Sequence, residues 1–301
     1  MIYLTGATGR LGRYVYNVFL SKKTEVFPIV RKPSGLKNEI ISDFSEGSLK
    51  AILKNAKAII HLAGSVKTYD KKELWNTNVE LTRVIVNAAP KNAKIILASS
   101  ISVYGKELAK KPADETTPIS PDSDYARSKY EAEKLVSQHP NHVILRIGTI
   151  YGPFEDYKIM LQKIKRERMQ IIGNGNNIIP FVHVEDAASV FIPALKKTGV
   201  YNIVGEAITQ REAYAVAAKE LGVKPPTKQV SFFLAYLSAW FAERAALLTG
   251  SECKITTEHI AILYFDRPFD CSKARRELGF LPRDPVNGIK QVVNELRPFI
   301  I

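Results

Sequence analysis

The residues of this 301-residue chain best suited to acid–base chemistry are Tyr125 and Lys129, which stand four positions apart. In a helix this spacing places both side chains on one face. A phenol has an ordinary pKa of about 10 and is a poor acid or base at neutral pH. A nearby ammonium favours the phenolate, so we expect Lys129 to lower the pKa of Tyr125 and to suit its oxygen for proton transfer to or from an alcohol. The same spacing also fits an exposed helix with two solvated side chains, so the rest of the chain must decide.

The chain opens on a glycine-rich turn between a short strand, residues 1–4, and the apolar helical pattern of residues 13–20. Glycines at positions 6, 9 and 12 allow a tight turn, close approach of the backbone to a phosphate, and close packing of strand against helix. The helix start supplies free N–H groups and a positive dipole end for a pyrophosphate. A tight turn with no ligand is the alternative. The residues predicted to contact a dinucleotide here are Gly6, Thr8, Gly9, Arg10, Leu11 and Gly12.

Strands and helices alternate through the first half of the chain, a pattern typical of a parallel sheet with helices on both faces. The further predicted strands are residues 25–30, 40–41, 58–62, 94–98 and 142–146. Ligands of such sheets bind beyond the carboxyl ends of the strands. We therefore expect one crevice to be lined by the residues that follow these strands, namely Gly6, Arg31, Asp43, Ala63, Ser100 and Thr149. The segment from Tyr125 to Lys129 lies between the last two strands and borders that crevice.

After Pro153 the regular alternation ends, and polar turns, a strand-like run at 202–204 and several helices follow. The predicted fold is α/β: a Rossmann-type doubly wound parallel sheet with a smaller mixed C-terminal substrate lobe. We assign residues 1–152 to a nucleotide-binding domain, to which 181–204 returns, and 153–301 mainly to the substrate lobe.

The bulk composition is that of a soluble globular protein, with 46% hydrophobic and 24% charged residues. The first predicted strand starts at Met1 with no signal-peptide pattern, and two cysteines, Cys253 and Cys271, cannot form a disulfide framework or a multi-cysteine metal site. We therefore expect a cytoplasmic protein. The net charge of +13 comes from scattered basic pairs, which favour a diffuse field that attracts an anionic cofactor or substrate over nucleic-acid binding.

Taken together, the motifs resemble those of the extended short-chain dehydrogenase/reductase family, also called NAD-dependent epimerases/dehydratases. The resemblance runs essentially end to end, and each motif alone is unspecific. In chain order the segments are Thr5–Gly12, Asp43-Phe44, His61–Gly64, Asn78-Val79 with Thr82, Ser99–Gly105, Tyr125–Lys129, Arg146–Pro153, Phe181–Ala188 and Asp270–Arg275.

This resemblance implies a role for each matching residue. Tyr125 would be the acid/base at the reacting oxygen, Lys129 would hydrogen-bond the nicotinamide ribose, and Ser100 would hold the substrate oxygen. Ser100 is otherwise a strand-end serine that caps a turn. Asp43 matches the carboxylate that accepts a hydrogen bond from the adenine amino group. The remaining cofactor contacts implied are Phe44, Leu62, Ala63, Gly64 and Asn78, of which Asn78 also fits an ordinary helix position.

Two histidines are better interpreted as structural. His61 ends a strand, where it packs or caps. His183 with Glu185 and Asp186 has the composition of a metal cluster, but the resemblance assigns that segment to the scaffold, so we expect no metal.

The residue after the second strand discriminates between the two nicotinamide cofactors. A carboxylate there would accept the ribose hydroxyls of NAD and repel a 2′-phosphate. This chain has Arg31-Lys32 instead, with Arg10 expected close by. Guanidinium groups suit a phosphate, so the sequence favours NADP(H). The alternative is that Arg31 stacks on adenine and that either NADP(H) or NAD(H) binds.

The substrate is less clearly encoded. Family members that act on nucleotide sugars commonly carry Asn where this chain has Thr149. The apolar run 230–244 is similar to the C-terminal lobe of the 3β-hydroxysteroid dehydrogenase/dihydroflavonol reductase-like branch. It is too short to span a bilayer and fits a core helix, a pocket wall, a peripheral membrane contact or a dimer contact.

The leading hypothesis is an oxidoreductase that transfers hydride between the nicotinamide and a secondary alcohol or ketone carbon. A nucleotide-sugar epimerase or dehydratase, of the UDP-sugar 4-epimerase type for example, is the alternative. A cofactor-bound sensor without turnover is a third, and the intact set of Ser100, Tyr125 and Lys129 disfavours it. The resemblance also implies a homodimer.

Overall fold

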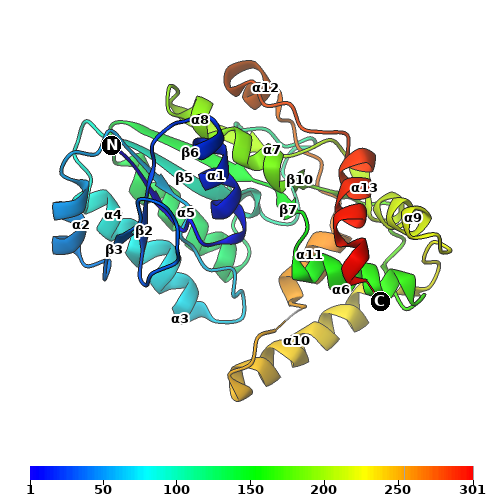
Figure 1. The fold of residues 1–301 in the computed structure, drawn as a ribbon. Coiled ribbons are helices and arrows are strands. Elements are labelled where there is room, and N and C mark those ends of the chain that lie inside the picture. The colour runs from blue at the N-terminus through cyan, green and yellow to red at the C-terminus, as the bar shows by residue number, and fades with distance from the viewer. Residues whose placement is uncertain (254, 301) are drawn as a thin grey trace.

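A seven-stranded parallel sheet forms the centre of the molecule in the computed structural model, which describes residues 1–253 and 255–300 (Figure 1). Its strand order is β11-β6-β5-β4-β1-β2-β3, and every neighbouring pair is parallel. The strands are β1 (Ile2–Thr5), β2 (Phe27–Val30), β3 (Ile40–Ile41), β4 (Ala58–His61), β5 (Lys94–Ser100), β6 (His142–Ile147) and β11 (Gly199–Ile203). The predicted fold class is confirmed, and the carboxyl ends of all seven strands meet at one edge.

Successive side chains along each strand pack into two different cores. Leu4 and Ile60 pack with one set of helices, whereas their neighbours Tyr3 and Ile59 pack with another. The first set is α1 (Arg10–Ser21), α7 (Val184–Ser189), α8 (Phe191–Ala194) and α12 (Ser272–Leu278). The second set is α2 (Glu46–Leu53), α4 (Leu81–Ala88) and α5 (Asp124–Ser137). Apolar side chains on both faces explain why these strands are nearly continuous hydrophobic runs.

A third core lies in the later part of the chain. It joins α6 (Glu155–Lys165), α9 (Gln210–Leu221) and α13 (Pro285–Leu296). Three small two-stranded sheets flank it: β7 (Thr149–Tyr151) with β10 (Phe181–His183), β9 (Ile178–Ile179) with β12 (Ile208–Thr209), and β8 (Ile171–Ile172) with β13 (Gln229–Val230). β11 nevertheless extends the main sheet beside β6, in parallel register from Gly199 opposite Val143.

Four short helical segments complete the fold. They are α3 (Lys71–Leu74), a π-helical segment (Trp75–Glu80), and 3₁₀ turns at Ile101–Tyr104 and Arg297–Phe299. π-Helical turns are rare and are frequent at functional sites, and this one carries the predicted cofactor residue Asn78.

The apolar run that begins at residue 230 forms α10 (Phe232–Thr249), followed by α11 (Thr257–Tyr264). The core-helix interpretation of this run is wrong, because the fully buried positions of α10 are Ala239, Glu243 and Ala246, while its large side chains face outward. Within residues 1–253 and 255–300, no helix combines the length and apolarity needed to cross a bilayer.

Candidate active site

The glycine turn after β1 brings three backbone segments into direct contact. Gly6 has φ +75°, and a Cβ added to it would lie 2.5 Å from the Ala63 nitrogen after β4. A Cβ on Gly12 would lie 1.9 Å from the Gly6 carbonyl oxygen. Only glycine fits at these two positions, because the obstructing atoms belong to backbone. The start of α1 is therefore held against the carboxyl ends of β1 and β4.

The same turn fits a phosphate group. Gly9 is the N-cap of α1, no side chain caps the helix, and its first turn holds no acidic residue. The first amides of a helix have no intrahelical partner and attract anions. The pyrophosphate of a dinucleotide matches this donor set.

Ser100, Tyr125 and Lys129 come together beside β5. The hydroxyl of Ser123 caps α5 by accepting a hydrogen bond from the Ala126 amide at 3.2 Å, which sets Tyr125 in the first turn. Lys129, only 8% exposed, donates from Nζ to the carbonyl oxygen of Ala98 on β5 at 2.6 Å. A hydrogen bond with the Ser100 side chain acts on Tyr125 from the end of that strand. Ser100 also caps the following turn, since its Oγ accepts from the Ser102 amide at 3.2 Å.

The expected lowering of the Tyr125 pKa is contradicted. Burial raises that pKa above its ordinary value, the Ser100 hydrogen bond opposes the rise, and the charge of Glu258 adds to it. Lys129 is not among the groups that shift this pKa, and its ammonium group donates to the Ala98 carbonyl oxygen. Tyr125 therefore keeps its proton at neutral pH, which suits a proton donor to a carbonyl oxygen.

Burial lowers the pKa of Lys129 from 10.5 to about 8, against the opposing charge of Glu133. Between these two pH values the unfolded chain holds a proton that the folded chain has lost, so stability rises with pH across the window. We expect this residue to add about 3 kcal/mol to the free energy of unfolding between pH 8 and 10.5. Urea unfolding of Lys129→Met at pH values across the window should lack the rise that the parent protein shows. Parallel stability curves for the two proteins would contradict the prediction.

Asn78 links the loop after β4 to α5. Its side chain is 2% exposed, accepts from the Ser65 amide at 2.7 Å and donates to Ser128 Oγ at 2.9 Å. A Cβ on Gly64 would lie 3.0 Å from Asn78 Oδ1 and 3.8 Å from Lys129 Nζ. The predicted residues Gly64, Asn78 and Lys129 are therefore neighbours, together with the preceding Leu62 and Ala63.

Arg31 and Phe44 lie together at the end of β2. The Arg31 guanidinium carbon is 5.6 Å from the centre of the Phe44 ring. The exposed Asp43 carboxylate accepts from the Ser45 amide at 2.9 Å and from Ser45 Oγ at 2.8 Å, which lowers the Asp43 pKa. Asp43 is thus an ionised acceptor beside a flat cation and an aromatic ring.

A hollow of about 340 Å³ adjoins Arg31 and is bordered on the far side by the start of α3 and the π-helical segment. Lys72 is a second cation there, and sequence reasoning missed it, because its approach depends on the fold of residues 65–77. Of the two acids, Glu73 is paired with Lys67 at 2.7 Å and Asp70 caps α3. The lining residues are Arg31, Asp70, Lys72, Glu73, Asn76 and Thr77.

Two predicted cofactor cations are placed differently from expectation. Arg10 does not join Arg31: its Nη1 pairs with Asp156 Oδ2 at 2.7 Å, and its guanidinium lies over Phe154. These partners stand far along the chain, which no local pattern indicates. Lys32 is exposed and does not line the hollow beside Arg31.

Both histidines of interest have structural contacts. His183 Nδ1 accepts from the Glu185 amide at 3.3 Å. His61 bonds to Thr5 Oγ1 at 2.8 Å and to Thr82 Oγ1 at 2.9 Å, and burial lowers its pKa to about 3, so it stays neutral. Glu185 and Asp186 pair with Arg283 at 2.8 and 2.9 Å. In the part of the chain that the structure describes, no group of three or more His, Cys, Asp or Glu side chains is arranged to hold a metal ion.

A buried polar network that sequence reasoning did not identify ties α5 to the sheet. Glu133 and Arg146 form an ion pair at 2.8 Å with side chains 4% and 7% exposed. Ser99 Oγ donates to Glu133 at 2.5 Å, Arg146 donates to the Tyr104 hydroxyl at 2.7 Å, and that hydroxyl donates to Asn202 at 2.9 Å. Glu133 follows Lys129 by one turn and Ser99 precedes Ser100, so the network fixes the helix and strand that carry the candidate catalytic residues.

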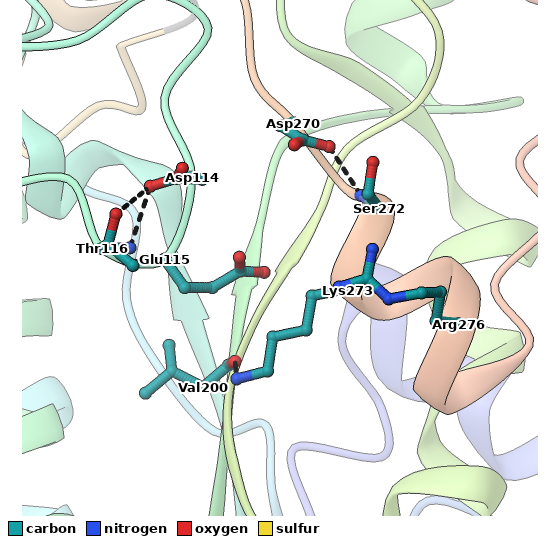
Figure 2. A pocket seen from close by; sticks show the side chains of 8 residues that line it. All are labelled: Asp114, Glu115, Thr116, Val200, Asp270, Ser272, Lys273 and Arg276. Carbon is teal, nitrogen blue, oxygen red and sulfur yellow. Dashed lines mark hydrogen bonds between the residues drawn. The ribbon is translucent and has the colours of Figure 1, made fainter.

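A second hollow, of about 450 Å³, lies among the turn at 114–116, β11 and α12 (Figure 2). Lys273 and Arg276 extend from α12, and Glu115 extends from the facing turn. Lys273 Nζ donates to the Val200 carbonyl at 2.8 Å, and Glu115 accepts from the Asn202 amide at 2.7 Å. None of the predicted site residues lines this hollow, so it is separate from the candidate active site.

The parallel sheet, the glycine turn and the Ser100–Tyr125–Lys129 group define an enzyme of the extended short-chain dehydrogenase/reductase class. The chain belongs to the NAD dependent epimerase/dehydratase family, whose model matches residues 2–204.

The relatives differ in activity. A putative UDP-glucose 4-epimerase of Methanocaldococcus jannaschii is 29% identical over 255 residues, covering 74% of this chain and 83% of its own length. A ceramide reductase of Caulobacter vibrioides is 27% identical over 245 residues, covering 75% of this chain and 72% of its own. The structure of the human epimerase family protein SDR39U1 with NADPH matches at TM-score 0.79 over 98% of this chain and 99% of its own, at 19% identity, a likeness of fold alone.

Proposed function

We propose that this enzyme transfers hydride between NADP(H) and a secondary alcohol or ketone carbon. The observation that carries the proposal is the meeting of Ser100, Tyr125 and Lys129 at the carboxyl end of β5, next to the glycine turn after β1. The ceramide reductase relative supports a net reduction.

The residues present fit the cofactor. The amides at the start of α1 would hold the pyrophosphate, Asp43 and Phe44 the adenine, and Lys129 the nicotinamide ribose. When bound, the nicotinamide supplies or accepts the hydride. Residues 1–152 with 181–204 would then form the cofactor side and 153–301 mainly the substrate side, a division that the pairing of β11 with β6 supports.

Tyr125 and Ser100 would handle the substrate oxygen. In reduction the protonated Tyr125 donates its proton to the carbonyl oxygen as negative charge develops there. Ser100 holds that oxygen and then stabilises the phenolate by the hydrogen bond that already lowers the Tyr125 pKa. In oxidation the same groups act in reverse.

The preference for NADP(H) rests on Arg31 and Lys72 at one hollow. A hydrogen bond to a charged group contributes about 1.5–3 kcal/mol, so Arg31→Ala should weaken NADPH binding by about tenfold or more and leave NADH binding nearly unchanged. Calorimetric titration with both cofactors measures this, and Lys32→Ala is the matched control, because Lys32 lies outside the hollow. Equal losses for NADPH and NADH in Arg31→Ala would indicate that Arg31 serves the adenine instead.

Nucleotide-sugar epimerisation is the second candidate, and the putative UDP-glucose 4-epimerase relative favours it. Thr149, which begins β7, has no side-chain amide to offer such a substrate. Incubation with NADPH and a panel of ketones, and separately with UDP-glucose, distinguishes the two. Consumption of NADPH with a ketone supports the oxidoreductase. Interconversion of UDP-sugars without net cofactor consumption would overturn it. The homodimer and the cytoplasmic location stay predictions.

A further inference from the structure

Helix α10 presents its large apolar side chains to the outside. Phe233, Leu234, Phe241 and Leu248 are 59–89% exposed, and Leu237 and Trp240 are 38% and 39% exposed. We call these six residues the α10 patch. Figure 1 shows α10 projecting along the lower edge of the molecule, beside α11. Contiguous apolar surface of this kind marks an interaction site.

The orientation of α10 is fixed by its inner face. Ala239 packs in a small cluster with Ile172 and Ile260. Glu243 is buried and accepts from the Thr257 amide at 2.9 Å, which anchors α10 to the first turn of α11. Rotation of the helix to bury its aromatic residues would break this anchor, so the outward apolar face is a property of the fold.

The charges around the α10 patch are mainly basic. Arg244 lies over Trp240, with its guanidinium carbon 5.3 Å from the ring centre. Exposed Lys228 precedes the helix. Exposed Glu252 follows the helix and is an acid near its C-terminal end. With a net charge of +13 behind it, this surface complements a negatively charged one.

We propose that α10 binds the surface of an anionic lipid bilayer, with the patch in the acyl boundary and the basic groups at the headgroups. An exposed apolar helix with Trp, Phe and Leu beside basic residues is typical of interfacial binding. A second copy of the chain fits less well. A helix of 18 residues is about 27 Å long and about 10 Å wide. An α10–α10 contact would bury a few hundred Å² on each side, below the roughly 800 Å² per partner of a stable interface.

Sedimentation with vesicles tests this, independently of any catalytic activity. The full chain should sediment with phosphatidylcholine vesicles that contain phosphatidylserine, and much less with phosphatidylcholine alone or at high salt. Phe241→Glu should lower the partition coefficient by about tenfold or more. Leu281→Glu is the matched control, since Leu281 is 79% exposed but lies outside the patch, and it should bind as the parent does.

Fluorescence gives a second measurement, because the chain has two tryptophans, Trp75 and Trp240. In Trp75→Phe, anionic vesicles should shift the emission of Trp240 to the blue. Binding unchanged by Phe241→Glu, or no shift, would overturn the proposal. Light scattering gives a third test. If the parent protein is a dimer in solution and Phe241→Glu is a monomer, a second copy covers the patch and the proposal is wrong.

Discussion

Replacing Tyr125 with Phe should lower the rate of hydride transfer by about a thousandfold, within the range of 10² to 10⁴ that general acid catalysis contributes. The phenol hydroxyl shares a hydrogen bond with Ser100, and burial keeps it protonated. Phe keeps the ring and its packing but has no proton to give. The measurement is single-turnover oxidation of bound NADPH with whichever ketone the screen identifies.

Tyr130→Phe is the control for Tyr125→Phe. Tyr130 lies on the same helix, with Lys134 Nζ 5.4 Å from its ring centre, and packs against a cluster that contains Val103 and Val204. It should keep the parent rate, and both variants should bind NADPH as the parent does. Retention of the full rate by Tyr125→Phe would contradict the proposed function. Loss of NADPH binding in that variant would indicate that Tyr125 positions the cofactor instead.

How far the sequence predicts this site depends on the distance over which each contact acts. The glycine turn is local: Gly6, Gly9 and Gly12 lie within one strand–turn–helix unit, and the structure places them against backbone as predicted. The strands of the parallel sheet are also predictable, because each is marked by a local run of apolar residues. By contrast, Arg10 pairs with Asp156 across 146 positions, and no pattern near Arg10 indicates that partner.

The pKa of Tyr125 shows a second limit. Its spacing from Lys129 is right for one helical face, but spacing does not determine burial or the rotamer of a lysine. Burial raises the pKa of Tyr125, and the Ala98 carbonyl takes the ammonium group of Lys129. The run of apolar residues in α10 fails similarly as a guide to the core, because the small residues of that helix face inward.

Replacing Glu133 with Ala should destabilise the protein by about 3–5 kcal/mol, the cost of leaving a buried charge without its partner. Arg146 would keep its bond to the Tyr104 hydroxyl but lose a carboxylate 2.8 Å away in a site where both side chains are almost completely buried. Ser99 would lose its acceptor as well. Glu133→Gln keeps an acceptor oxygen for these donors and should cost less. Urea unfolding at neutral pH measures both.

Glu131→Ala is the matched control for Glu133→Ala, on the same helix and with the same loss of a carboxylate. Glu131 pairs with Lys134 at 2.6 Å, but their side chains are 36% and 50% exposed, and exposed pairs contribute about 0.2–1 kcal/mol. A loss in Glu133→Ala no larger than in Glu131→Ala would show that the buried pair does not hold α5 to β5 and β6.

If the large loss is found, the pH dependence of the stability of Glu133→Gln is a further test. Glu133 raises the pKa of Lys129, so without its charge that pKa should fall below about 8. The rise of stability with pH should then begin at lower pH, a shift that packing alone would not produce.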